Sequence, residues 1–295
     1  MDVPAVTDTM AQPVPEGAGA AADPIGGALA ALRRHWPEYG IEAAGLGLFL
    51  VSACVFATLL EHPGSPVRQA VSDALLRRIP MGLAMALTAV TIIYSRWGKR
   101  SGAHLNPSVT LTFWRLGKVE PWDAVFYITA QFLGAMTGVG LAGVMLQGRP
   151  ADPAVSYAAT VPGAWGVAVA FLAEVAITFV LMSVILRVSN RPDWNRFTGL
   201  CAGLLVASYI VVEAPLSGMS MNPARTLGSA VHAQVWTALW VYFTAPPLGM
   251  LAAAQVYLWR RGARAVRCAK LHHDNRERCI FRCGWGEGHA DDSAS

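Results

Sequence analysis

The chain of 295 residues is 54% hydrophobic and only 14% charged, with 23 Lys+Arg against 19 Asp+Glu. Roughly 25% of the residues in a typical soluble domain are charged, and disordered chains are richer in charge still. The composition therefore excludes a disordered chain and disfavours a soluble globule, and five cysteines are too few for a disulfide scaffold. The class that remains is a polytopic membrane protein.

The N-terminal segment, residues 1–38, is rich in Ala, Pro and Gly and has no apolar period. We expect a flexible cytoplasmic arm here. We expect no secretory signal, because such a signal begins with basic residues followed by an apolar run. A channel domain is predicted over 39–260, followed by a basic tail, 261–295.

The channel domain contains six apolar stretches of the length that a membrane-crossing helix requires, roughly 20 residues. They lie near 41–60, 79–97, 121–146, 163–187, 197–214 and 235–259. The two termini and the segments 96–118 and 187–196 collect most of the basic residues. Cytoplasmic segments of membrane proteins are enriched in Lys and Arg, so both termini are predicted to be cytoplasmic.

An internal repeat is the strongest signal in the sequence. Residues 101–111 read Ser-Gly-Ala-His-Leu-Asn-Pro-Ser-Val-Thr-Leu, and residues 217–227 read Ser-Gly-Met-Ser-Met-Asn-Pro-Ala-Arg-Thr-Leu. Each copy follows the second span of a three-span half, the halves being about 39–147 and 161–260. An odd number of spans per half gives the two halves opposite orientations, so the pattern predicts an inverted repeat.

Each Asn-Pro pair has the features of a helix start. Asn is a strong N-cap and Pro suits the first helical position, so short helices are predicted near 108–116 and 224–232. Neither is long enough to cross the hydrocarbon. Two such half-helices would meet near the membrane midplane, where non-helical backbone survives only if protein buries it or it lines a water-filled path. The stretches 101–105 and 217–221 are therefore predicted to line a pore.

The half-helices also predict a barrier to ions. Each helix N-terminus carries the equivalent of about half a positive charge, and both would face the midplane. The Asn106 and Asn222 amides would donate hydrogen bonds to a water molecule at the same point. Cations and protons would be repelled, whereas neutral molecules would pass.

On these features the chain resembles the aquaporin family of water and small-solute channels. The resemblance covers roughly 38–260. The family's two Asn-Pro-Ala boxes match Asn106-Pro107-Ser108 and Asn222-Pro223-Ala224, with Ser108 departing from the usual Ala. The resemblance implies an all-α membrane fold of six transmembrane helices and two re-entrant half-helices. It also implies a homotetramer with one pore per subunit, in the plasma membrane, without a cofactor.

The resemblance also implies roles for individual residues. Buried glutamates in spans 1 and 4 hold the pore loops, and a glutamine and a histidine support the first loop. An arginine after the second box belongs to the outer selectivity filter, whose other members follow by ungapped counting. The supporting residues are Glu42, Glu174, Gln131 and His104, and the filter residues are Ala86, Ile210, Met219 and Arg225. A slip of one residue would replace Ile210 with Tyr209.

A filter with Ala86 and Ile210 lacks the large aromatic and the histidine that the resemblance associates with strict water channels. It favours small uncharged solutes as well as water, such as glycerol, urea or neutral metalloid hydroxides. The alternative is an ion-coupled secondary transporter on the same inverted repeat. An enzyme is disfavoured, because no span carries a nucleophile paired with a base or metal ligands at helical spacing.

The tail contains the pattern Cys268-x3-His272-His273-x5-Cys279-x3-Cys283 among many basic residues. Cys and His can bind zinc, but the spacing is not that of a standard finger. We favour a juxtamembrane basic segment held by anionic lipid over metal binding or redox chemistry, and assign no metal site. The expected partners are other copies of the chain, membrane lipid, water and small neutral solutes, with no nucleic acid.

Overall fold

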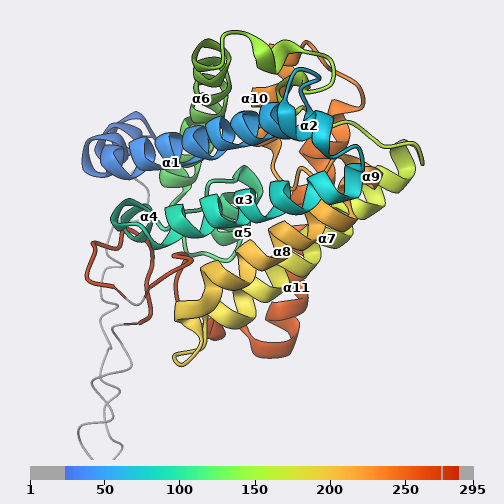
Figure 1. The fold of residues 1–295 in the computed structure, drawn as a ribbon. Coiled ribbons are helices and arrows are strands. Elements are labelled where there is room, and N and C mark those ends of the chain that lie inside the picture. The colour runs from blue at the N-terminus through green and yellow to red at the C-terminus, as the bar shows by residue number, and fades with distance from the viewer. Residues whose placement is uncertain (1–23, 274, 286–295) are drawn as a thin grey trace, which may run out of the picture.

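The computed structural model describes residues 24–273 and 275–285, and every regular element in these ranges is a helix. Long helices form two sets of three, separated by short connecting helices (Figure 1). The first set is α1 (Pro24–Glu61), α3 (Ala74–Tyr94) and α6 (Pro121–Met145), and the second is α7 (Val167–Ser189), α8 (Thr198–Val212) and α11 (Leu239–Arg261).

The remaining elements are short. Two of them, α5 (Pro107–Arg115) and α10 (Pro223–Ala233), are the predicted half-helices. The connecting helices are α2 (Pro66–Ala70), α4 (Arg96–Ser101) and α9 (Ala214–Ser217), with 3-10 turns η1 (Arg149–Ala151), η2 (Ser156–Ala158), η3 (Asn195–Phe197) and η4 (Ala263–Ala265).

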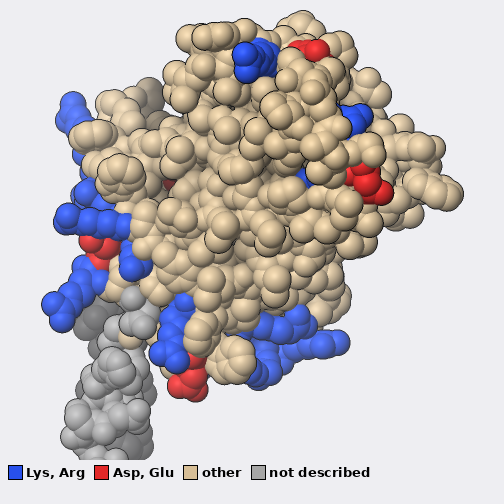
Figure 2. Space-filling model, in the orientation of Figure 1, with Lys and Arg blue, Asp and Glu red and all other residues tan. Residues whose placement is uncertain are grey.

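Six helices among the described residues are long and apolar enough to cross a membrane. They correspond in order to the six predicted spans, so the prediction of six spans is confirmed. On the face shown in the space-filling view, a broad area with few charged side chains separates two edges of the molecule (Figure 2). Lys and Arg gather along one of these edges, over α4, the beginning of α8 and the end of α11, as the charge pattern predicted (Figures 1 and 2).

The first helix differs from its prediction. Residues 24–38 were assigned to a flexible arm, but they form the beginning of α1, and residues 1–23 lie outside the described part. The reason is that this stretch has polar partners on its neighbours. Glu38 is fully buried and pairs with Arg100 at 3.0 Å, and His35 Nδ1 lies 2.7 Å from Asp123 Oδ1. These contacts order a segment that has no apolar period of its own.

Packing follows the two halves. Helix α1 packs on α6 and α7 packs on α11, while the two second spans, α3 and α8, pack on each other. Both outer pairs approach closely at a glycine: a Cβ atom on Gly134 would lie 2.1 Å from Ala43 O, and one on Gly249 would lie 2.4 Å from Val175 O. Small residues at such crossings let helices in lipid gain van der Waals contact. The short helices cross between halves, α5 against α11 and α10 against α6.

Candidate pore

The two half-helices begin at asparagine caps in the middle of the molecule. Asn106 Oδ1 accepts a hydrogen bond from Ser108 N at 2.8 Å. Asn222 Oδ1 accepts from Ala224 N at 3.0 Å and from Arg225 N at 3.2 Å. Each cap satisfies backbone N–H groups that the first turn of a helix leaves without a partner.

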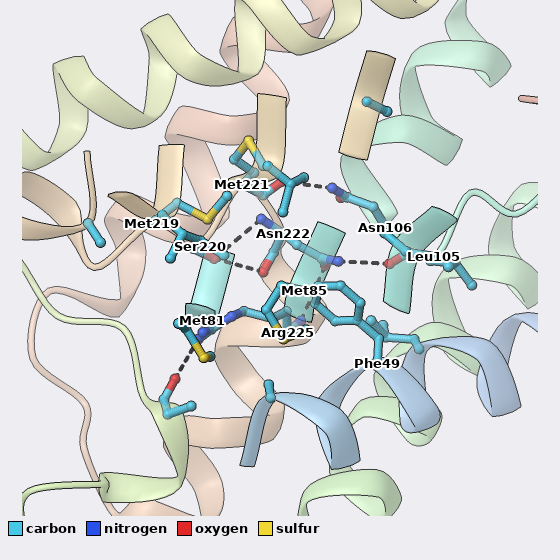
Figure 3. A pocket seen from close by; sticks show the side chains of 18 of the residues that line it. Phe49, Met81, Met85, Leu105, Asn106, Met219, Ser220, Met221, Asn222 and Arg225 are labelled. Atoms are coloured by element: carbon cyan, nitrogen blue, oxygen red, sulfur yellow. Dashed lines mark hydrogen bonds between the residues drawn. The ribbon is translucent and has the colours of Figure 1, made fainter. Parts of the chain in front are cut away.

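The amide groups of the same two asparagines bind the opposite half of the molecule (Figure 3). Asn106 Nδ2 donates to Met221 O at 2.8 Å, and Asn222 Nδ2 donates to Leu105 O at 2.7 Å. An Asn amide carries two hydrogens, so each Nδ2 keeps one for a further acceptor. Both asparagines line the same cavity. The positive ends of α5 and α10 and two amide donors therefore meet at one level.

A buried glutamate holds the loop before each box. Glu42 is fully buried and accepts four hydrogen bonds. Ser101 Oγ and His104 N donate to its Oε1 at 2.8 and 3.1 Å, and Leu105 N and Gln131 Nε2 donate to its Oε2 at 2.6 and 2.8 Å. These bonds give a buried carboxylate in a membrane span the polar partners it requires.

Glu174 has the same arrangement in the second half. It is fully buried and accepts from Ser217 Oγ and Ser220 N at 2.8 and 2.6 Å, and from Met221 N at 2.8 Å. Three of the donors to Glu42 have counterparts here at the repeat spacing. Each glutamate thus accepts hydrogen bonds from one serine and from two backbone N–H groups of its loop.

The loops have alternating left-handed backbone. Ala103, Leu105, Met219 and Met221 have φ between +50° and +56°, which is uncommon for residues other than glycine. Such conformations persist only where the surroundings fix them. The hydrogen bonds to the two glutamates fix them here. The result is that Leu105 O and Met221 O point toward the opposite asparagines.

One cavity, with a volume of about 330 Å³, extends along this structure. Glu61 and Arg78 lie at the end next to α2, and both asparagines line its middle. Ile185 and Leu271 lie at the end on the basic edge. The cavity is therefore lined by residues of both predicted loops, by both capping asparagines and by residues from both ends of the long helices.

Three of the four predicted filter residues line this cavity: Ile210, Met219 and Arg225. Arg225 is partly buried, and its Nη1 donates to Ala158 O at 2.7 Å. Ala86 does not line the cavity, and its carbonyl lies 3.3 Å from where a Cβ on Gly203 would sit. Ungapped counting therefore gives the wrong α3 residue: the helix turns Ala86 toward α8.

The α3 residues that face the cavity are Arg78, Met81, Met85 and Ala89. Met81 and Met85 lie beside Arg225 in Figure 3. Sequence reasoning missed them, although Met81, Met85 and Ala89 follow each other at the four-residue spacing of one helix face. The α1 residue Phe49 also lines the cavity and was missed.

The remaining predicted residues lie around the first loop. His104 lines the cavity, is 3% exposed, and pairs through Nδ1 with Thr110 Oγ1 at 3.0 Å. Gln131 joins Glu42 to the same Thr110 hydroxyl, which it reaches at 3.1 Å. Ser108 is fully buried at the start of α5, beside the Asn106 cap.

Two buried tyrosines complete the repeat and were also missed. Tyr127 Oη donates to Ser101 O at 2.7 Å, and Tyr242 Oη donates to Ser217 O at 2.6 Å. Both tyrosines are fully buried. A comparison of the third spans of the two halves would have found them, because they occur at nearly the same spacing as the boxes.

The chain is similar to a solved structure and to known proteins. The structure matches the aquaglyceroporin of Plasmodium falciparum with a TM-score of 0.62 over 76% of this chain and 95% of that one, at 23% identity. This likeness confirms the predicted fold class. Among curated relatives, aquaporin NIP2-3 of Zea mays is 37% identical over 205 residues, 67% of this chain and 64% of that protein. The glycerol uptake facilitator protein-like 6 of Lactiplantibacillus plantarum is 34% identical over 189 residues, 60% of this chain and 82% of that protein.

The match spans less than two thirds of the plant proteins' own length. The model of the major intrinsic protein family matches residues 41–257, which is well over half of the chain and includes both Asn-Pro boxes. The chain belongs to the major intrinsic protein family.

Proposed function

We propose that the protein is a passive channel for water and small uncharged solutes that excludes protons and ions. The observation that carries the proposal is the pair of asparagines, each capping one half-helix, bonded to the opposite loop and lining one cavity. The names of its relatives, aquaporin and glycerol uptake facilitator, support the same function.

The exclusion of protons follows from the donors at the asparagine pair. A water oxygen at this level accepts from the free amide hydrogens of Asn106 and Asn222. Its own hydrogens then point away along the pore in both directions, so a chain of waters has no continuous direction for proton transfer. The positive ends of α5 and α10 add an electrostatic barrier to every cation.

The solute class follows from the cavity wall. Arg225 supplies a fixed charge with donors left over after its bond to Ala158 O. Around it lie thioether and aliphatic side chains, including Met81, Met85 and Ile210. A wall with one donor group and flexible apolar neighbours suits small neutral polyols, urea or metalloid hydroxides as well as water. We assign the filter to Met85, Ile210, Met219 and Arg225.

The assembly and orientation are proposed on the same grounds. We infer from the basic edge in Figure 2 that both described chain ends lie on the cytoplasmic side, because cytoplasmic segments of membrane proteins are enriched in Lys and Arg. We propose that α5 and α10 are re-entrant and that the protein forms a homotetramer in the plasma membrane. Channel activity requires no cofactor and no catalytic step.

Stopped-flow light scattering on proteoliposomes tests the function, with water and glycerol gradients run side by side. The wild-type chain is expected to accelerate both fluxes over empty vesicles. Ile210→Trp fills the cavity and should abolish glycerol flux. Its control is Leu204→Trp on the same helix, where Leu204 is 69% exposed on the outer face.

Equal loss of flux in both variants would contradict the placement of the pore. Saturable flux that follows a pH gradient would replace the channel with an ion-coupled transporter. If the wild-type chain accelerates the flux of neither water nor glycerol, the proposal is overturned for both molecules.

A further inference from the structure

The C-terminal tail is docked on the basic edge of the channel (Figure 1). We call residues 263–273 and 275–285 the tail segment. It has no helix beyond the turn η4, yet it hydrogen-bonds to the channel at several separate places. The donors and acceptors are Leu271 N to Gly102 O at 3.1 Å, Arg282 N to Lys118 O at 3.0 Å, Arg267 N to Asn190 Oδ1 at 2.7 Å and His104 Nε2 to Ala269 O at 2.9 Å.

Four side chains of the tail segment converge on one point. The ligand atoms of Cys268, His273, Cys279 and Cys283 all lie within 4.8 Å of one another. Cys268 Sγ is 3.6 Å from Cys279 Sγ, and Cys283 Sγ is 3.0 Å from His273 Nε2. A tetrahedral zinc ion, with bonds of about 2.3 Å to sulfur and about 2.0 Å to nitrogen, separates its ligand atoms by about 3.5–3.8 Å. The cluster thus has the size of such a site.

We propose that Cys268, His273, Cys279 and Cys283 bind one Zn²⁺ ion, and that this ion holds the tail segment over the cytoplasmic mouth of the pore. Three thiolates and one imidazole are the ligands of structural zinc sites, and soft sulfur ligands disfavour Mg²⁺ and Ca²⁺. Four protein ligands leave no open position, so the role is structural rather than catalytic.

Lys270 supplies a buried positive charge close in sequence to the proposed ligands. Its side chain is 1% exposed, and Nζ donates to Glu277 O at 2.9 Å and to Arg278 O at 2.8 Å. Zn²⁺ with three thiolates has a net charge of −1, and a buried ammonium between two ligand residues balances it. A buried lysine without a compensating charge is costly. The zinc site therefore also explains why Lys270 is buried.

Two aromatic side chains of the tail segment stack on histidines, one on a proposed ligand and one on a residue of the first pore loop. The Trp285 indole stacks on His273 with ring centres 5.7 Å apart, and Arg267 lies over the indole at 4.6 Å. Phe281, between the two last ligands, stacks on His104 of the first pore loop at 5.3 Å. The metal-binding loop and the pore loop are thus in direct contact.

The loop between the first two ligands reaches the pore itself. Leu271 is 5% exposed and lines the end of the cavity on the basic edge. Its backbone N–H donates a hydrogen bond to Gly102 O in the first pore loop. With Cys268 and His273 fixed to one ion, Leu271 is held in the mouth and narrows it. Without the ion, the four ligand residues are no longer crosslinked. Metal binding and folding are coupled in segments that lack regular secondary structure, so the tail segment should become less ordered.

Metal content tests the site without any measurement of flux. The purified full-length chain, kept reduced, is expected to contain one zinc per chain. After exchange with Co²⁺ it should show thiolate-to-metal charge-transfer absorption. Cys279→Ser/Cys283→Ser should lose both signals, whereas Cys201→Ser in α8 and His272→Gln, beside a ligand but outside the cluster, should keep them.

Several outcomes would overturn the site. Absence of metal in the reduced chain would do so, and so would full zinc content in the double variant. A mass lower by two hydrogen atoms, without metal, would show a disulfide in place of the metal, and peptide mapping would show whether it joins Cys268 and Cys279.

The closing of the mouth rests on the proposed channel function and has its own test. Removal of zinc with a chelator should increase hydrogen exchange in the tail segment and raise glycerol flux by about twofold or more. Leu271→Ala should raise flux while zinc stays bound. Unchanged exchange and flux after chelation would overturn the role in closing the mouth. If no variant conducts in either state, the channel function fails, while the metal measurement stands.

Discussion

The two halves of the molecule hold their pore loops in the same way but differ in what covers them. In each half a serine hydroxyl and two consecutive backbone N–H groups bind one buried glutamate, and a tyrosine closes the back of the loop. The repeated residues are those that fix strained backbone. The pore geometry therefore depends on a few polar contacts inside each half rather than on the spans themselves.

The relevant difference between the two loops lies at the residue directly before Leu105 in the first half and before Met221 in the second. The first half has His104, which binds the tail at Ala269 O, and the second has Ser220, which binds Thr226 within its own half. The first loop faces the basic edge and receives the tail segment. The residues common to both halves hold the pore loops, whereas the departure at His104 marks where the tail segment docks.

Removal of the glutamates should have the largest effect, and an unequal one. Glu42→Ala removes the acceptor of four hydrogen bonds and Glu174→Ala that of three, although Gln131 Nε2 keeps its bond to Thr110 Oγ1. Unsatisfied buried donors cost about 1–3 kcal/mol each, so Glu42→Ala should lower Tm in detergent by about 10 °C or more. Glu174→Ala should lower it somewhat less, and Asp193→Ala, on the exposed surface, should not change it. A larger loss for Glu174→Ala would contradict the importance of Gln131.

Arg225 separates the halves by charge, because its counterpart in α5 is Val109. Arg225→Ala removes a fixed positive charge from the cavity wall and should admit protons or small cations, while the helix dipoles still oppose them. The measurement is ion leak across proteoliposomes under a pH or potential gradient. Arg149→Ala, at an exposed turn, is the control. Leak no greater than that of the control would remove Arg225 from the filter.

The sequence predicts the repeat, the spans and the boxes because each has a local signal. Asn-Pro starts a helix, apolar length specifies a span, and an offset of 116 residues relates Ser101 to Ser217. The position of Ala86 was wrong because the rotation of α3 is set by its packing on α8, which leaves no mark in a residue count. The Cys and His residues of the tail form a visible pattern in the sequence, but only folding brings Cys268 Sγ within 3.6 Å of Cys279 Sγ.

The rotation of α3 gives the next prediction. Met85 lines the cavity, so Met85→Ala should widen the filter and raise glycerol flux by about threefold, with a smaller change for water. Ala86→Gly on the same helix should leave both fluxes unchanged, because Ala86 faces α8. Permeability ratios for the two variants measure the difference. A larger effect of Ala86→Gly would restore the ungapped assignment.

The smallest expected effect is at Ser108, where the two boxes differ. Ser108 Oγ is buried without a hydrogen-bond partner among the described residues, whereas Ala224 at the matching place has no polar atom to satisfy. A buried hydroxyl without a partner costs about 1 kcal/mol or more, so Ser108→Ala should raise Tm by a few degrees and leave water and glycerol flux unchanged. The reciprocal Ala224→Ser should lower Tm by a similar amount. If Ser108→Ala instead slows flux, the hydroxyl contributes to the pore, and the two boxes are not equivalent.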